Sequence, residues 1–154
     1  MRNVKLSARS LRLLMNLWPP FIGASIHVER LSPDYTEAVV RMRLGLLNRN
    51  YMGTHFGGSL YAMTDPFFAL LVMHQLGRDY VVWDKASRID YQLPGRGTVR
   101  ASFRVTPEQV DAIRHATAGG EKFEPVFSVD VVNRQGEVVA TVEKTVYVRR
   151  KPKD

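Results

Sequence analysis

Residues 57–77 read GGSLYAMTDPFFALLVMHQLG, and this stretch decides the fold. Large apolar side chains recur on nearly all sides of the helix that it predicts, and Gly77 ends the pattern. A helix of this kind belongs inside a protein rather than on its surface. We therefore expect residues 57–76 to form a buried central helix around which the rest of the chain is built.

Strand patterns surround the central helix in the sequence. Six segments read as strands, and these are residues 24–30, 36–44, 81–93, 98–106, 122–132 and 137–149. Turns at residues 94–97 and 133–136 join neighbouring strands, and a short helix begins at Thr106 and ends at Gly119. Strands joined by tight turns pair antiparallel. The sequence thus predicts an α+β fold, a curved antiparallel sheet wrapped around the central helix, as a single domain over residues 1–154.

The two ends of the chain differ from its middle. Residues 1–20 predict a short amphipathic helix that Ser7 caps and that Pro19-Pro20 end, and residues 149–154 read as a basic tail. The ends account for the whole net charge of +7, since residues 13–148 are neutral. A neutral body offers no groove for a nucleic-acid duplex, so we expect no specific nucleic-acid partner.

Composition excludes several classes of function. The 154 residues include no cysteine, which rules out disulfides, thiolate zinc sites and cysteine nucleophiles. The four histidines are scattered without metal-ligand spacing, so no metal site is predicted. No stretch approaches the roughly 20 apolar residues of a membrane-spanning helix, and the apolar run near the N-terminus is broken too early for a targeting peptide. We expect a cytoplasmic protein with no membrane span.

Candidate chemistry begins at the start of the central helix. The N–H groups of Gly57 and Gly58 can be approached closely by a ligand oxygen, and the positive end of a helix adds to their effect. Such a pair could polarise a carbonyl and hold the oxyanion that forms when it is attacked. The alternative is that the glycines only permit a tight turn or close packing. The residues alone leave both readings open.

Asp65 is an acid within an otherwise apolar segment, and burial of a lone carboxylate is costly. Facing a cavity, it could act as a general base on water or as a nucleophile. Alternatively, Asp65 caps a helix that restarts at Pro66. In the loop before the glycines, Asn48 and Asn50 could orient a water or a carbonyl or stabilise a turn, and His55 could line the site.

The run Gly53-Thr54-His55-Phe56-Gly57-Gly58 followed by Asp65, together with residues 89–97, resembles the hotdog-fold acyl-CoA thioesterases of the phenylacetyl-CoA thioesterase type, in particular an uncharacterised thioesterase-like branch. The resemblance covers about residues 20–150. It implies a central helix within a curved antiparallel sheet, homodimers that join two sheets, and in some cases dimers of dimers. Active sites in such dimers lie at the interface between subunits.

The resemblance also assigns roles to residues. The N–H of Gly57 or Gly58 would hold the thioester carbonyl oxygen, and Asp65 of the other subunit would activate water or attack directly. Asn50 corresponds to the loop asparagine of the family, with Asn48 as the second candidate. We expect the substrate to be bound by His55, Phe56, Asn48 and Tyr61.

One position departs from the family pattern, which commonly reads His-Gly-Gly. Here Phe56 takes the place of that histidine and His55 lies one residue earlier, whereas the spacing of eight positions from Gly57 to Asp65 is kept. The departure argues against the hydratases and dehydratases of this fold, which use a histidine at the site for proton transfer.

We therefore expect a hydrolase that acts on an acyl-CoA or related acyl thioester, with no cofactor besides the CoA of its substrate. The first alternative is a non-catalytic hotdog protein that binds an acyl-CoA or acyl chain and retains it without hydrolysis. The second is binding of nucleic acid or anionic membrane through the basic ends. That binding would depend strongly on salt and be lost when residues 1–12 and 149–154 are removed.

Overall fold

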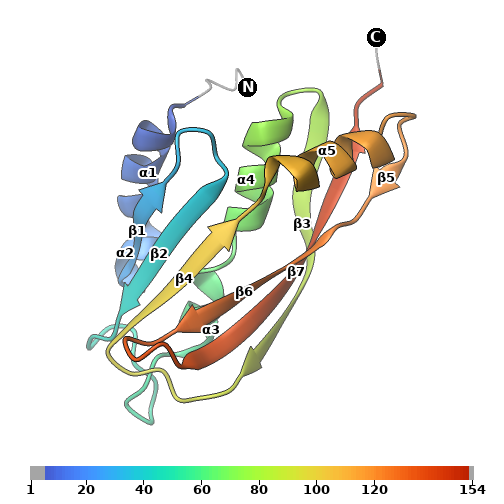
Figure 1. Cartoon of the computed structure of the whole chain (residues 1–154). Coiled ribbons are helices and arrows are strands. Elements are labelled where there is room, and N and C mark those ends of the chain that lie inside the picture. The colour runs from blue at the N-terminus through green and yellow to red at the C-terminus, as the bar shows by residue number, and fades with distance from the viewer. Residues whose placement is uncertain (1–5, 153–154) are drawn as a thin grey trace.

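The structure is a computed structural model and describes residues 6–152. Seven strands form one sheet within these residues: β1 (Ile26–Leu31), β2 (Glu37–Arg43), β3 (Tyr80–Tyr91), β4 (Thr98–Arg104), β5 (Lys122–Phe123), β6 (Val126–Val132) and β7 (Val138–Arg150). The strands lie in the order β1-β2-β4-β6-β7-β3, and the short β5 pairs with the end of β7 (Figure 1). Every pairing is antiparallel, so the predicted sheet is confirmed.

Five helices accompany the sheet in the described part of the chain: α1 (Ala8–Asn16), α2 (Pro19–Gly23), α3 (Gly57–Ala62), α4 (Phe67–Leu76) and α5 (Pro107–Ala116). Ser7 caps α1 by accepting the N–H of Ser10, as predicted. Pro19-Pro20 do not simply end the N-terminal helix, because they begin α2. Proline is tolerated in the first turn of a helix, where its missing N–H would have no partner.

The central segment is buried as predicted, but it is two helices rather than one. The chain turns between the end of α3 and the start of α4, and Pro66 occupies the cap position of α4. Pro66 has no N–H to continue the helix, and its ring would clash with the carbonyl four residues earlier. Phe67, Leu71 and Val72 of α4 are fully buried where this helix packs on the sheet (Figure 1).

The strands alternate between buried and exposed side chains. On β2 and β4 the inward positions hold residues such as Val40 and Phe103, which close the core over α4. On β7 the inward positions are apolar except at one place, where Lys144 is completely buried. A buried lysine requires partners for its ammonium, and those partners define the site described below.

The basic C-terminal residues are not all a tail. β7 continues through Arg149 and Arg150, which pair with Val81 and Tyr80 of β3. The expected tail at 149–154 is therefore wrong for its first two residues. Other basic residues of the two ends, Arg2, Lys5 and Lys153, lie outside the described residues.

Candidate functional site

Gly57 and Gly58 are the first two residues of α3, and their N–H groups are free. No described residue accepts a hydrogen bond from either N–H, as expected at the first turn of a helix. Neither glycine has a positive φ. The need for glycine is instead one of space: a Cβ on Gly57 would lie 2.9 Å from the Tyr91 hydroxyl oxygen, and one on Gly58 would lie 2.6 Å from Cε1 of Phe56. The two glycines therefore allow close packing and also present two backbone N–H donors without partners among the described residues.

The asparagines of the preceding loop both bond to the backbone of that loop. Asn48 is buried, accepts the N–H of Gly45 at 2.7 Å and donates to the carbonyls of Ala24 and Arg43. All of its side-chain groups have partners within the protein, which fits the turn-stabilising alternative, and its role in substrate binding stays a prediction. Asn50 accepts the N–H of Thr54 at 3.1 Å and forms further bonds within the same turn. These bonds fit the turn-stabilising alternative, but Asn50 also lines the cavity described below, so its role at the site stays a prediction.

His55 is buried beneath the same loop. Its Nε2 lies 2.9 Å from the Gly97 carbonyl, so Nε2 carries the proton and Nδ1 is an acceptor. That Nδ1 is buried and has no partner among the described residues. Burial lowers the pKa of His55, against the opposing effect of the bond to Gly97, and the ring is therefore neutral near pH 7.

A cavity of about 480 Å³ opens beside the glycines. Gly57 and His55 line it, together with residues of the segment that follows β3, including Leu93 and Arg96. Most of its lining is apolar. The hydroxyl of Tyr91, another lining residue, donates to the Gly57 carbonyl at 3.0 Å and so fixes this part of the wall. An acyl or pantetheine chain is the kind of ligand that such a wall accommodates.

Asp65 lies in the turn between α3 and α4, away from that cavity. Its side chain is 52% exposed and does not cap α4, so the capping alternative is wrong. The Tyr61 hydroxyl donates to Asp65 Oδ1 at 2.9 Å, which makes Tyr61 a partner of the acid. Neither residue lines the cavity beside Gly57, so within one protomer the structure does not bring the acid and the glycines together.

Lys144 is the residue of this site that the sequence reading missed. Its ammonium donates to Asp65 Oδ1 at 2.9 Å, to Asp84 Oδ2 at 3.1 Å and to the Tyr61 hydroxyl at 3.2 Å. The sequence does contain a sign of this residue. The side chains of β7 that point into the core, such as Val142 and Val146, are apolar, and Lys144 is the exception among them. Three donors meet three acceptors, so this ammonium is fully satisfied.

Asp84 of β3 completes the cluster. Its Oδ1 is buried without a partner among the described residues, and a register shift in the pairing of β3 with β7 follows it. Burial raises the pKa of Asp84, although the nearby Lys144 opposes the change. Burial would lower the pKa of Lys144, but its bonds to Asp65 and Tyr61 and the charge of Asp84 outweigh burial, so that pKa is raised. Lys144 is therefore a cation at neutral pH.

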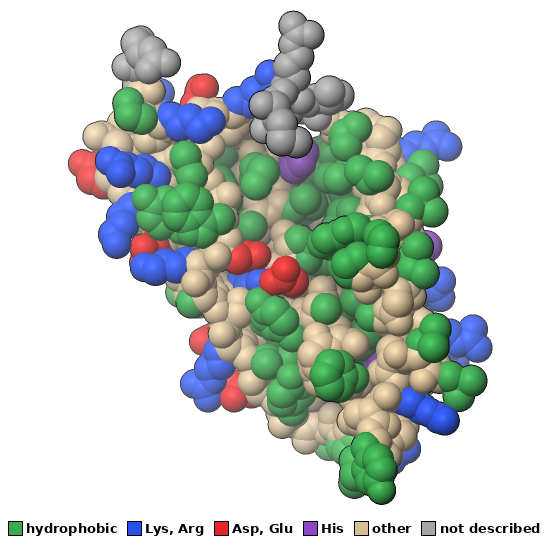
Figure 2. Space-filling model, turned by 180° about the vertical axis from the view of Figure 1, so that it is seen from behind, with side chains coloured by type: hydrophobic (Ala, Val, Ile, Leu, Met, Phe, Trp, Pro, Cys, Tyr) green, Lys and Arg blue, Asp and Glu red, His purple; other side chains and the backbone are tan. Residues whose placement is uncertain are grey.

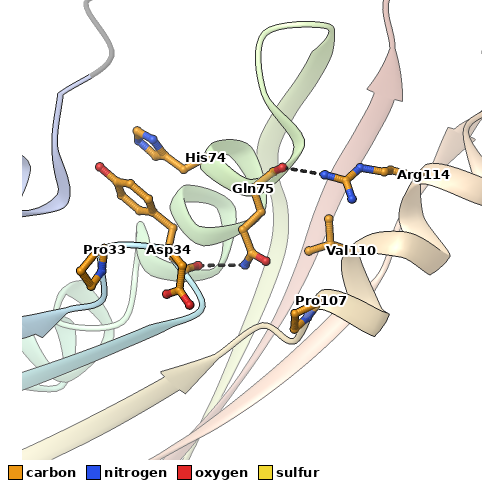
Figure 3. Close-up of a pocket in the computed structure, with 8 residues that line it drawn as sticks. Pro33, Asp34, His74, Gln75, Pro107, Val110 and Arg114 are labelled. Atoms are coloured by element: carbon orange, nitrogen blue, oxygen red, sulfur yellow. Dashed lines mark hydrogen bonds between the residues drawn. The ribbon is translucent and has the colours of Figure 1, made fainter.

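A second cavity, of about 350 Å³, lies between the β1–β2 turn, the end of α4 and the start of α5 (Figure 3). Its polar groups bond to one another: Gln75 donates to the Tyr35 carbonyl at 2.8 Å, and Arg114 donates to the Gln75 carbonyl at 2.8 Å. The ring of His74 stacks on Tyr35. None of the residues predicted from the sequence to form the site lines this cavity.

The described residues also bear on two other kinds of function, metal binding and membrane insertion. Residues 6–152 contain no group of three or more histidines, cysteines or carboxylates placed to hold a metal ion. Within the same residues, no helix is long and apolar enough to cross a membrane. Seen from behind, the molecule shows hydrophobic side chains over much of the visible face, with acidic side chains near its middle (Figure 2). The cytoplasmic location stays a prediction.

Comparison with known proteins yields one family. A family model described as "Domain of unknown function (DUF4442)" matches residues 7–148. No curated protein sequence matches the chain.

Solved structures give the fold. A protein of unknown function from Pseudomonas aeruginosa, described as a probable thioesterase, matches with a TM-score of 0.84 at 20% identity, over 94% of this chain and 97% of that one. A thioesterase from Haemophilus influenzae has a TM-score of 0.69 at 12% identity, over 97% and 95%. The PaaI protein of the E. coli phenylacetic acid degradation operon has a TM-score of 0.64 at 20% identity, over 94% and 92%. These likenesses confirm the hotdog fold.

Proposed function

Because the chain belongs to the DUF4442 family and has the fold of several thioesterases, we propose that it hydrolyses acyl thioesters, with acyl-CoA as the substrate class. The observation that carries the proposal is the state of Asp65. Its carboxylate is half-exposed, caps no helix, and has one oxygen, Oδ2, that accepts no hydrogen bond from a described residue. A fixed and accessible carboxylate suits a general base or a nucleophile.

The free N–H groups of Gly57 and Gly58 supply the second part of the mechanism. They would hold the thioester carbonyl oxygen and stabilise the oxyanion that forms on attack. With only six residues, α3 adds little macrodipole, so the effect rests on the two local donors. Phe56 lies against Gly58 and forms one side of this position.

Either of two reaction courses fits Asp65. As a base, Oδ2 takes a proton from water while the water oxygen attacks the carbonyl carbon; the C–S bond then breaks and the proton passes to the departing thiolate. As a nucleophile, Oδ2 attacks the carbonyl carbon and expels the thiolate, and water then hydrolyses the mixed anhydride. Both courses end with a carboxylic acid and a free thiol, and neither needs a metal or redox cofactor.

The separation of Asp65 from the cavity favours a site shared between two protomers. We place Asp65 of one protomer beside Gly57 and Gly58 of its partner in a homodimer. β3 pairs only with β7 among the described strands, so its other edge is open to a second copy. Trp83 and Tyr91 are exposed aromatic residues on this strand. A further pairing of dimers into a tetramer is compatible with this arrangement.

Substrate binding is assigned to the cavity beside the glycines. Its apolar wall would take the acyl or pantetheine chain, and Arg96 on its lining would meet a CoA phosphate. His55 shapes the floor of the cavity, because its ring is buried and held by Gly97.

One observation favours a second candidate function. Asp65 is already engaged by the Lys144 ammonium at 2.9 Å, and an ion pair of this kind can serve the structure alone. A non-catalytic protein that binds acyl-CoA would tolerate this pairing without cost.

A panel of acyl-CoA esters distinguishes the two functions. The purified protein is incubated with short, medium, long and phenylacetyl-CoA esters, and released thiol is measured alongside ligand retained after gel filtration. Thiol release above the uncatalysed rate supports the thioesterase. Retention of an ester with no thiol release supports the binding protein instead.

A further inference from the structure

The contacts of Asp65 divide its two carboxylate oxygens. Oδ1 receives both the Tyr61 hydroxyl and the Lys144 ammonium, each at 2.9 Å. Oδ2 accepts no hydrogen bond from a described residue. A carboxylate held at one oxygen by two donors keeps a fixed plane, and its other oxygen points to a constant position.

The two halves of the Lys144–Asp65 pair also differ in exposure. The Lys144 side chain is 0% exposed, whereas that of Asp65 is 52% exposed. A pair that served only to fill the core would have both members inside, and apolar residues of similar volume often replace such pairs without loss of stability. Here a cation inside the protein holds an anion at its surface, which is an arrangement that fixes a reacting group.

We infer that Lys144 is a positioning residue, which with Tyr61 holds Oδ1 of Asp65 so that Oδ2 alone reacts. The inference rests on the proposed function, because it assigns to Lys144 the orientation of the acid that the hydrolysis uses. Lys144 itself does not touch the substrate in this account. It acts through Asp65.

Asp84 gives the arrangement a second property. The charged and titratable groups that face Asp65 are Tyr61 from α3, Lys144 from β7 and Asp84 from β3, among the described residues. Two carboxylates therefore share the Lys144 ammonium, which lies 2.9 Å from Oδ1 of Asp65 and 3.1 Å from Oδ2 of Asp84.

Two variants separate the loss of the bond to Oδ1 from a change of charge in the cluster. Lys144→Met removes the ammonium and keeps the length of the side chain, so Oδ1 of Asp65 keeps only the Tyr61 hydroxyl. Asp84→Asn removes one charge but keeps an oxygen for Lys144, so the bond from Lys144 to Asp65 stays in place and kcat should fall less than in Lys144→Met. Lys85→Met is the matched control, because Lys85 is adjacent to Asp84 in sequence but pairs with Glu124 at 2.8 Å.

Steady-state kinetics on the best acyl-CoA ester of the panel measure the effect. In Lys144→Met, kcat should fall by about tenfold or more with a smaller change in KM, because Asp65 loses its orientation rather than the substrate its binding surface. Tyr61→Phe removes the other donor to Oδ1 and should lower kcat in the same direction. Lys85→Met should leave kcat and KM at their wild-type values.

The outcomes separate the inference from the proposed function. An active thioesterase whose kcat is unchanged in Lys144→Met overturns the inference and leaves the proposed function standing. A wild-type protein that releases no thiol from any ester contradicts the proposed function, and the inference falls with it. If Lys144→Met does not fold, Tyr61→Phe decides, since an unchanged kcat in that variant overturns the inference.

Discussion

Lys144 and Asp65 lie 79 positions apart in the sequence, and their side chains meet with Nζ 2.9 Å from Oδ1. The contact joins the inward face of β7 to the turn between the two central helices. It fixes the one carboxylate that the proposed hydrolysis depends on, and it links the packing of the sheet to the chemistry at the surface. The predictions below test this account of the site and the fold that supports it.

Gly58→Ala should reduce hydrolysis more than it reduces stability. The new Cβ would lie 2.6 Å from Cε1 of Phe56, so the ring must move, and it would move beside the N–H that is proposed to hold the oxyanion. We expect kcat/KM to fall by about tenfold or more. The change in unfolding free energy should stay within about 1 kcal/mol, because alanine is the better helix former. Phe56→Ala/Gly58→Ala, which gives the methyl group room, should regain activity; equal loss in the single and double variants would argue against this cause.

Mixed dimers should recover activity from two inactive variants. Asp65→Asn lacks the acid. In Gly57→Val, the added Cβ would lie 2.9 Å from the Tyr91 hydroxyl oxygen, so the side chain does not fit at the start of α3. If the site takes Asp65 from one protomer and Gly57 from the other, each mixed dimer contains one intact site. Random exchange then gives about one quarter of wild-type activity. A site within one protomer would give none, and either result is read from thiol release after the variants are refolded together.

The free energy of unfolding should decrease at acidic pH, in part because of His55. Burial lowers the pKa of His55 below its ordinary value of 6.5, so the unfolded chain binds a proton that the folded protein resists. This contribution to stability is complete above about pH 6.5 and is lost progressively as the pH falls below that value. Urea unfolding at several pH values should show a smaller decline for His55→Gln than for wild type. The pKa of His27 is also lowered, so some decline will remain. Identical slopes for the two proteins would contradict the prediction.

Thr106→Ala should destabilise the protein by about 1 kcal/mol. Thr106 accepts the N–H of Gln109 at 3.3 Å, and the Gln109 side chain accepts the N–H of Thr106 at 2.9 Å. Loss of this capping box leaves an N–H at the start of α5 without a partner. We expect thermal unfolding to shift by about 2–4 °C to lower temperature. Thr106→Ser retains the cap oxygen and serves as the control; if it loses as much as Thr106→Ala, the cap is not the cause.

Local patterns were sufficient to predict most of the fold. The apolar run at residues 57–76, the alternation on β2 and β4, and the capping residues Ser7 and Thr106 each depend on neighbours in the sequence, and the structure confirms them. The break of the central helix at Pro66 was left open, because a proline can either kink a helix or end it. Pro19 and Pro20 were expected to end the N-terminal helix, but they begin α2, because proline is also typical of the first turn of a helix.

The site was harder to predict, because it depends on contacts between distant segments. The residue types of Gly57, Gly58 and Asp65 marked them as candidates in the sequence. Only the fold shows that Asp65 of one protomer does not line the cavity beside Gly57. Asn48 looked like a ligand group, and only its bonds to Ala24 and Arg43 show that it holds the loop. Lys144 was detectable as a charge in an inward register, but its partners come from α3, β3 and the turn between the central helices.

The most direct test of the account is the hydrolysis rate of Asp65→Asn. Asp90→Asn is a close control, because Asp90 is also half-exposed, at 53%, and also pairs with a cation, Arg88. On the best acyl-CoA ester of the panel, kcat should fall by about a hundredfold or more in Asp65→Asn and remain at the wild-type value in Asp90→Asn. Undiminished turnover by Asp65→Asn would contradict the mechanism and remove the acid from the site.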